Sequence, residues 1–136
     1  MAHILVIDDD DSFRRLLCDF LTDAGHEVSS ARDSAAAMAD IGERVPDLVI
    51  LDYQMPGITG TGLLAYLRTR EETLQLPVIF LSGVNIITFS NEVPPDPRVR
   101  FMSKPLDFPI LKVPIAELLS LNAAPAERPG PGGFVP

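Results

Sequence analysis

The chain has 136 residues, of which 46% are hydrophobic and 22% charged, so its length and composition are those of one ordinary folded domain rather than a disordered protein. The formal net charge is −8 and no basic stripe is available to neutralise phosphates, which argues against direct binding to nucleic acid. The single cysteine, Cys18, excludes an internal disulfide and a multi-cysteine metal site, as expected in a reducing compartment.

The first apolar run, residues 4–7, is predicted to be a buried strand. It is too short, and too closely followed by four aspartates, to be a signal peptide or a membrane span. We therefore expect a cytoplasmic protein that does not insert into a membrane. Residues 11–24 follow as an amphipathic helix that ends at Gly25. The apolar face of this helix consists of Phe13, Leu16, Leu17, Phe20 and Leu21.

Strands and helices alternate along the next part of the chain. The further predicted strands are residues 27–30, 48–51, 78–81 and 99–102, and the further predicted helices are residues 34–44 and 62–72. The runs at 48–51 and 78–81 are continuously apolar, which is typical of strands in a parallel sheet that is covered on both faces. Because parallel strands need crossover helices, this order predicts a doubly wound α/β fold, in which ligands bind beyond the carboxyl ends of the strands.

Proline is frequent in the last third of the chain. Six prolines fall between residues 94 and 114. Since a proline inside a helix costs about 3 kcal/mol, we expect the fourth and fifth helices to be short, displaced or kinked. From Asn122 onward proline and glycine are so common that residues 122–136 are predicted to be a flexible tail or linker after a folded domain over residues 1–121.

Polar side chains stand at the carboxyl ends of several predicted strands. Asp8 and Asp9 follow the first strand, Asp52 follows the third, Ser82 the fourth and Lys104 the fifth. In a parallel sheet these ends meet at one edge, where several carboxylates repel one another unless a cation joins them. Mg²⁺ suits such oxygen ligands, and a hydroxyl and an ammonium would hold an anion on the metal. The combination indicates phosphoryl transfer onto an aspartate.

These residues resemble the motifs of a known family, the receiver domain of bacterial two-component response regulators. The matching stretches are residues 4–10 with Arg14, residues 48–57 with Gly60, Leu81-Ser82-Gly83 and Lys104-Pro105. The resemblance covers about residues 3–120. It implies a flavodoxin-like, doubly wound, five-stranded parallel sheet in the order 2-1-3-4-5. Where the family has a regular fourth helix, this chain has the proline-rich residues 91–97, so we expect that helix to be short or remodelled.

The resemblance also implies which residues hold the phosphoryl group and the metal. Asp52 would be the phosphoacceptor, and its donor would be the phosphohistidine of a sensor histidine kinase or of a histidine phosphotransfer protein. Mg²⁺ would be bound by Asp52, by Asp9 directly, by Asp8 mainly through water, and by the backbone carbonyl of Gln54. Asp10 and Asp11 are instead expected to cap the following helix or to be solvated.

Three further residues would respond to phosphorylation. The resemblance implies that Ser82 moves to hydrogen-bond the phosphoryl oxygen, that Lys104 forms an ion pair with it, and that Phe101 is the aromatic switch that follows Ser82. The protein would then be a signalling switch that catalyses only its own phosphorylation and dephosphorylation. We expect it to act by contact with an unknown downstream protein, and a homodimer remains compatible with the sequence.

Two other functions remain open at this stage. The first is a phosphate-independent protein-interaction module on the same fold, which the proline-rich residues 91–97 favour. The second is a small phosphohydrolase of the haloacid-dehalogenase type, because residues 8–12 loosely resemble the Asp-x-Asp-x-Thr pattern of that family. Such an enzyme would use Asp8 rather than Asp52 as its nucleophile, and residues 52–57 would then have no role.

Overall fold

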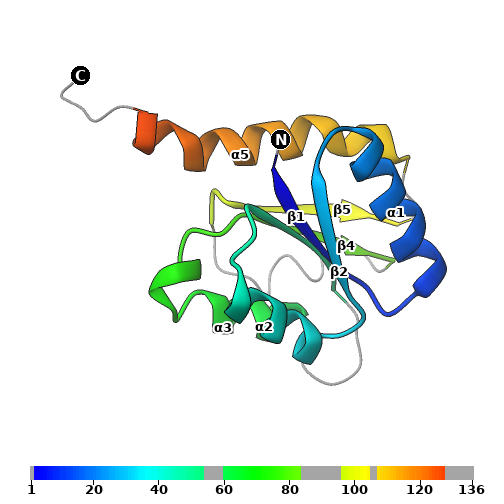
Figure 1. Cartoon of the computed structure of the whole chain (residues 1–136), viewed down its shortest axis with the longest axis horizontal. Coiled ribbons are helices and arrows are strands. Elements are labelled where there is room, and N and C mark those ends of the chain that lie inside the picture. Colours follow the sequence, from blue (N-terminus) through cyan, green and yellow to red (C-terminus); the bar gives the residue numbers. More distant parts are fainter. Residues whose placement is uncertain (1, 54–59, 84–95, 105–106, 128–136) are drawn as a thin grey trace.

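The computed structural model describes residues 2–53, 60–83, 96–104 and 107–127, the last six of them in backbone only. The strands are β1 (His3–Ile7), β2 (Glu27–Ala31), β3 (Leu48–Asp52), β4 (Val78–Ser82) and β5 (Val99–Ser103). The helices are α1 (Asp11–Asp23), α2 (Ser34–Glu43), α3 (Gly60–Leu67) and α5 (Lys112–Glu127), with the 3₁₀ turns η1 (Glu71–Thr73) and η2 (Phe108–Leu111). All five strands are parallel, in the order β2-β1-β3-β4-β5, which confirms the predicted doubly wound fold (Figure 1).

The central strands are buried along their whole length. Every residue of β1, β3 and β4 is buried, whereas β2 and β5 at the two edges are partly exposed. This matches the sequence, because the continuous apolar runs lie on the strands that have neighbours on both sides. The carboxyl ends of β1, β3 and β4 are therefore held in place by strands that are packed along their whole length.

Helices cover both faces of the sheet, as Figure 1 shows, with α1 and α5 on one side and α2 and α3 on the other. Alternate residues of β1 serve the two layers, since Ile4 and Val6 belong to one core cluster and Leu5 and Ile7 to the other. The first cluster is completed by residues of α1, η2 and α5, namely Leu17, Leu21, Leu111, Ile115 and Leu118. The second is completed by residues of α2 and α3, including Ala37, Ile41, Leu63 and Leu67.

Two helices differ from the prediction, α1 in which residues it buries and α3 in where it begins and ends. Leu16 was expected on the buried face of α1, but it is 58% exposed, whereas Leu17 and Leu21 are fully buried. Helix α3 begins at Gly60 and ends at Leu67 instead of covering residues 62–72. The guanidinium of Arg68 donates to the carbonyls of Thr73 and Leu76, and these bonds stabilise a separate turn where the helix was expected to continue.

The fifth helix was expected to be short, displaced or kinked, and the expectation of a short helix was wrong. Helix α5 has 16 residues. Pro114 lies in its first turn, where a backbone N–H has no partner within the helix, and Pro125 lies near its end. The helix continues to Glu127. The expectations for the fourth helix and for the rest of the tail concern residues 84–95 and 128–136, which lie outside the described residues.

Candidate functional site

Three carboxylates meet at the carboxyl edge of the sheet. Asp8 directly follows β1 and Asp52 ends β3, and these two strands are neighbours. Asp8, Asp9 and Asp52 each offer a carboxylate oxygen, and the three oxygens lie within 4.8 Å of one another. Asp8 and Asp52 are only 1% and 7% exposed, whereas Asp9 is open to solvent. The sheet thus brings together the three acidic side chains that the sequence singled out.

Lys104 supplies the cation nearest to these carboxylates. Its ammonium Nζ lies 2.6 Å from Oδ2 of Asp8 and 3.7 Å from Oδ2 of Asp52. The backbone N–H of Lys104 donates to the carbonyl of Ser82 at 2.7 Å, which extends the pairing of β5 with β4 and fixes where the side chain starts. One ammonium, paired with Asp8 and Asp52, accompanies a cluster of three carboxylates, so the cluster keeps a surplus of negative charge that a divalent cation would offset.

The donor set fits Mg²⁺. This ion prefers carboxylate and water oxygens at about 2.0–2.1 Å in an octahedron, in which ligand oxygens lie roughly 3 to 4 Å apart. The three carboxylate oxygens are already gathered to nearly this spacing. Among the residues that the structure describes, this is the one group of three acidic, histidine or cysteine side chains close enough to share an ion. The expected fourth protein ligand, the backbone carbonyl of Gln54, lies outside the described residues.

Ser82 and Phe101 lie on the two strands beside the acidic cluster. Ser82 is completely buried at the end of β4, one position beyond the residue that pairs with Asp52. Phe101 on β5 is partly buried, and its ring stacks on the ring of Phe80 with centroids 5.6 Å apart and an interplanar angle of 9°. Tyr53, directly after Asp52, meets the same Phe80 ring edge-on at 6.3 Å. An aromatic row therefore runs from the acidic cluster to the edge strand.

Gly60 allows α3 to begin close to Asp52. Its N–H donates to the carbonyl of Tyr53 at 3.3 Å. A Cβ at this position would lie 3.0 Å from the backbone oxygen of Asp52 and 3.0 Å from the Phe80 ring, which is closer than side chains normally pack. The absence of a side chain at Gly60 therefore allows α3 to pack closely against the Asp52 backbone and the Phe80 ring.

The two other aspartates of the acidic run belong to α1, as predicted. Asp10 is the N-cap of α1 and accepts a hydrogen bond from the N–H of Phe13 at 3.1 Å. Asp11 forms an ion pair with Arg14 at 2.6 Å, and the hydrogen bond and charge of that guanidinium lower the pKa of the Asp11 carboxyl. Arg14 also donates to the backbone carbonyl of Asp8 at 2.6 Å, so it links the helix to the strand end that carries the site.

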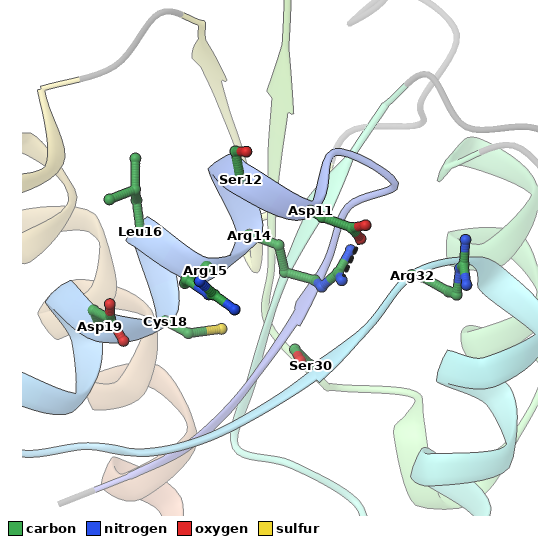
Figure 2. Close-up of a pocket in the computed structure, with 9 residues that line it drawn as sticks. All are labelled: Asp11, Ser12, Arg14, Arg15, Leu16, Cys18, Asp19, Ser30 and Arg32. Carbon is green, nitrogen blue, oxygen red and sulfur yellow. Dashed lines mark hydrogen bonds and ion pairs between the residues drawn. The ribbon is translucent and has the colours of Figure 1, made fainter.

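A hollow of about 860 Å³ lies beside this site, between α1 and the end of β2 (Figure 2). It is lined by Asp11, Ser12, Arg14, Arg15, Leu16, Cys18, Asp19, Ser30 and Arg32. Its lining carries three arginines and two aspartates, and one of the aspartates, Asp11, pairs with Arg14. None of the three clustered carboxylates lines it, so the hollow is a surface feature next to the acidic site and not a part of it.

The sequence did not identify Phe13 as a neighbour of the site. It was placed in the core, but its ring is only partly buried and the ammonium of Lys104 lies 4.3 Å from the ring centroid. The one available signal was its position in the first turn of a helix that starts directly after the acidic run. No periodicity argument could show that a lysine 91 positions later would reach the same ring.

The comparison with protein families identifies one match. A family model described as the response regulator receiver domain matches residues 4–115, which is most of the chain. No helix in the described part of the chain is long and apolar enough to cross a membrane.

Individual relatives agree with this match. The phosphate regulon transcriptional regulatory protein PhoB of Pseudomonas aeruginosa is 36% identical over 80 residues, which are 59% of this chain and 35% of PhoB. The response regulator PleD of Caulobacter vibrioides is 36% identical over 84 residues, which are 62% of this chain and 18% of PleD. The similar segment therefore spans about a third or less of the length of these curated relatives.

Among the solved structures of similar fold are two chains that are covered almost completely by the alignment with this protein. The receiver domain of NtrX from Brucella abortus has a TM-score of 0.78 and 32% identity, covering 86% of this chain and 98% of that one. The chemotaxis response regulator CheY4 of Vibrio cholerae has a TM-score of 0.78 and 26% identity, covering 87% and 98%.

Proposed function

The chain belongs to the receiver-domain family of two-component response regulators, and from this premise we propose that it is a phosphorylation-controlled switch with Asp52 as its phosphoacceptor. One observation carries the proposal: Asp52 is gathered with Asp8 and Asp9 at the edge of the sheet and faces the ammonium of Lys104. Receiver domains act as signalling switches and not as enzymes on external metabolites. We accordingly assign this chain no reaction beyond the gain and loss of its own phosphoryl group.

The proposed chemistry is an in-line transfer. An oxygen of the Asp52 carboxylate forms a bond to phosphorus while the bond from phosphorus to the donor's histidine nitrogen breaks, and the electron pair returns to the imidazole ring. Lys104, 3.7 Å from Asp52, lies where it can offset charge on the transferred group. Mg²⁺, held by Asp8, Asp9, Asp52 and the carbonyl of Gln54, would supply further charge neutralisation.

The proposed switch begins at Ser82. A phosphoryl group adds about −1.5 to −2 charges and three acceptor oxygens, so the hydroxyl of Ser82 on the neighbouring strand gains a new acceptor. Movement of Ser82 toward the phosphoryl group opens space near Phe101, whose ring is only partly buried and stacked on Phe80. Phe101 then changes its burial, which alters the exposed edge of the sheet.

The proposed phosphodonor is a sensor histidine kinase or a histidine phosphotransfer protein in the cytoplasm. The surface of α1 beside the acidic site offers it the hollow of Figure 2, whose lining combines the exposed side chain of Leu16 with charged side chains of both signs. An exposed apolar side chain with a polar and charged rim is a common arrangement for a contact between proteins. The output is a contact with a downstream protein, and a homodimer fits the same proposal.

The direct test is incubation with acetyl phosphate and Mg²⁺, followed by intact-mass measurement and peptide mapping of the trapped acylphosphate. We expect a single phosphoryl group on Asp52, no modification of Asp52→Asn, and full modification of Asp19→Asn, which removes an exposed carboxylate on the outer face of α1.

Other outcomes of this test favour the alternatives. A folded protein that is not modified, and whose amide spectrum over residues 96–104 does not respond to Mg²⁺ and beryllofluoride, would favour the phosphate-independent interaction module. Modification of Asp8 in place of Asp52 would favour the chemistry of the haloacid-dehalogenase type, which the family match does not support.

A further inference from the structure

The side chain of Lys104 has an aromatic contact besides its carboxylate partners. Its ammonium lies 4.3 Å from the centroid of the Phe13 ring while it is 2.6 Å from Asp8. We propose that Phe13 is a positioning residue, whose ring face holds the Lys104 ammonium beside Asp52 for its role in phosphoryl transfer. This inference rests on the proposed function and assigns a role to a residue that the sequence placed in the core.

A lysine side chain at this site needs such a support. Lys104 is fixed at its backbone by the hydrogen bond to Ser82, but four methylene groups separate that anchor from the ammonium. Its side chain is 20% exposed, so water could draw the ammonium away from the cluster. The negative face of an aromatic ring attracts a cation and is most effective in a partly desolvated place such as this one.

The ring of Phe13 is itself held in place. It meets the ring of Phe108 edge-on, with centroids 5.7 Å apart and an interplanar angle of 75°. Phe108 lies in η2, four residues after Lys104, and it also packs against Phe20 of α1 at 5.6 Å. This T-shaped contact with Phe108 restricts the movement of the Phe13 ring, and the Lys104 ammonium lies over a face of that ring.

The ring does something that the carboxylates cannot do. Asp8 is both the closest partner of Lys104 and a proposed metal ligand, so a bound Mg²⁺ would compete with the ammonium for the Asp8 carboxylate. Phe13 is neutral and binds no metal, and its attraction for the ammonium does not depend on the state of Asp8. It therefore keeps Lys104 near Asp52 when the phosphoryl group arrives.

The chain provides a matched control for this role. Phe13 and Phe20 both lie on α1 and both pack on Phe108, but Lys104 contacts only the ring of Phe13 among the described aromatic residues. Phe13→Leu and Phe20→Leu therefore remove similar packing, while only the first removes the cation contact. Phe13→Tyr keeps the ring face and tests rescue.

Two measurements on the full chain test the inference. The first is the maximal rate of phosphorylation by acetyl phosphate at saturating Mg²⁺, which we expect to fall about 2- to 5-fold in Phe13→Leu and to stay near the wild-type value in Phe13→Tyr and Phe20→Leu. The second is the proton chemical shift of the Lys104 ε-methylene group, which a ring face moves upfield. That displacement should disappear in Phe13→Leu alone.

Two results would overturn the inference. One is a Phe13→Leu protein that loses the upfield shift but is phosphorylated at the wild-type rate. The other is a Phe20→Leu protein that is slowed as much as Phe13→Leu, because the effect would then be one of packing. Failure of the proposed function itself looks different, since the wild-type chain would then not be phosphorylated at all.

Discussion

Arg68 and Asp96 form an ion pair that joins the end of α3 to the start of the edge strand β5, with Nε of Arg68 3.0 Å from Oδ2 of Asp96. Both side chains are largely buried, and Arg68 also donates to the carbonyls of Thr73 and Leu76. One guanidinium thus joins a helix end, the η1 turn and the approach to the strand that leads to Lys104. Because β5 carries Phe101 and leads to Lys104, this pair at the start of β5 stabilises the strand whose other end carries part of the candidate site.

Asp96→Asn should lower the free energy of unfolding by about 1–2 kcal/mol, because Arg68 loses its charged partner in a partly buried place. Urea unfolding followed by circular dichroism measures this. Glu72→Gln is the matched control, since Glu72 pairs with Arg70 on the exposed surface and its loss should cost less than about 0.5 kcal/mol. Equal losses in the two variants would show that the Arg68–Asp96 pair has no special weight.

The same pair predicts a dependence of stability on pH. Burial alone would raise the pKa of Asp96, but the hydrogen bonds from the Arg98 amide and the Arg68 guanidinium bring its pKa below the ordinary value. The unfolded chain therefore binds a proton here at higher pH than the folded chain does. The contribution of Asp96 is complete above the unfolded pKa of about 3.9 and is lost as pH falls through the lower folded pKa. Unfolding midpoints measured from pH 7 to pH 3 should fall less steeply in Asp96→Asn, and parallel curves would contradict this.

Lys104→Met should strengthen the binding of Mg²⁺ and weaken phosphorylation. The ammonium competes for Asp8 and repels a second cation, so its removal should raise Mg²⁺ affinity on the order of 3- to 30-fold. The rate of phosphorylation should fall because the charge beside Asp52 is gone. Titration calorimetry and acetyl phosphate kinetics measure the two effects, with the exposed Lys112→Met as control. A drop in Mg²⁺ affinity would mean that Lys104 does not compete for the carboxylates.

Gly60→Ala should destabilise the protein by about 1–3 kcal/mol, since the new methyl group would press on the Asp52 backbone and the Phe80 ring. The chain contains its own control at Gly42 in α2, where a Cβ would meet open space. Gly42→Ala should stabilise the protein by about 0.5–1 kcal/mol, because alanine favours a helix. Thermal unfolding of both variants measures the contrast, and a shift of the same sign in both would refute the packing argument.

Leu16→Ser should slow phosphorylation by a donor protein without slowing phosphorylation by acetyl phosphate. Leu16 is exposed, so stability should change by less than about 0.5 kcal/mol, and phosphorylation by the small donor acetyl phosphate should not change. Transfer from a kinase or phosphotransfer protein that docks on α1 should slow, which phosphoryl transfer assays with a radiolabelled donor protein measure. Leu74→Ser, at an exposed leucine next to η1, is the control. Equal transfer to both variants would place the docking surface elsewhere.

The central features of the fold could be predicted because they are recorded in continuous stretches of sequence. The apolar runs of β1, β3 and β4 identify buried parallel strands, and the polar residues that follow them meet as expected at one edge. Periodicity identified α1, but it could not tell which arc of the helix faces the sheet. Leu16 was therefore placed inside, although it is exposed.

The rest depends on where side chains from distant parts of the chain come to lie. The ring of Phe13 meets Lys104 only because β5 ends beside the start of α1, and spacing in the sequence does not contain this proximity. Proline frequency likewise misjudged α5, because the cost of a proline depends on its position in the helix and not on the number of prolines nearby. Pro114 falls in the first turn, where it is tolerated.

The contact between Lys104 and Asp8 joins two residues 96 positions apart, and this has a consequence for the order of events during synthesis. All three clustered carboxylates are part of the chain once residue 52 has been added, whereas their ammonium partner is added only after the fifth strand. The nascent chain therefore carries an acidic cluster without its counter-charge until most of the domain has been made. Competence for phosphoryl transfer would then arise late, together with the closing of the last strand, so that incompletely made or truncated chains carry the acceptor but do not signal.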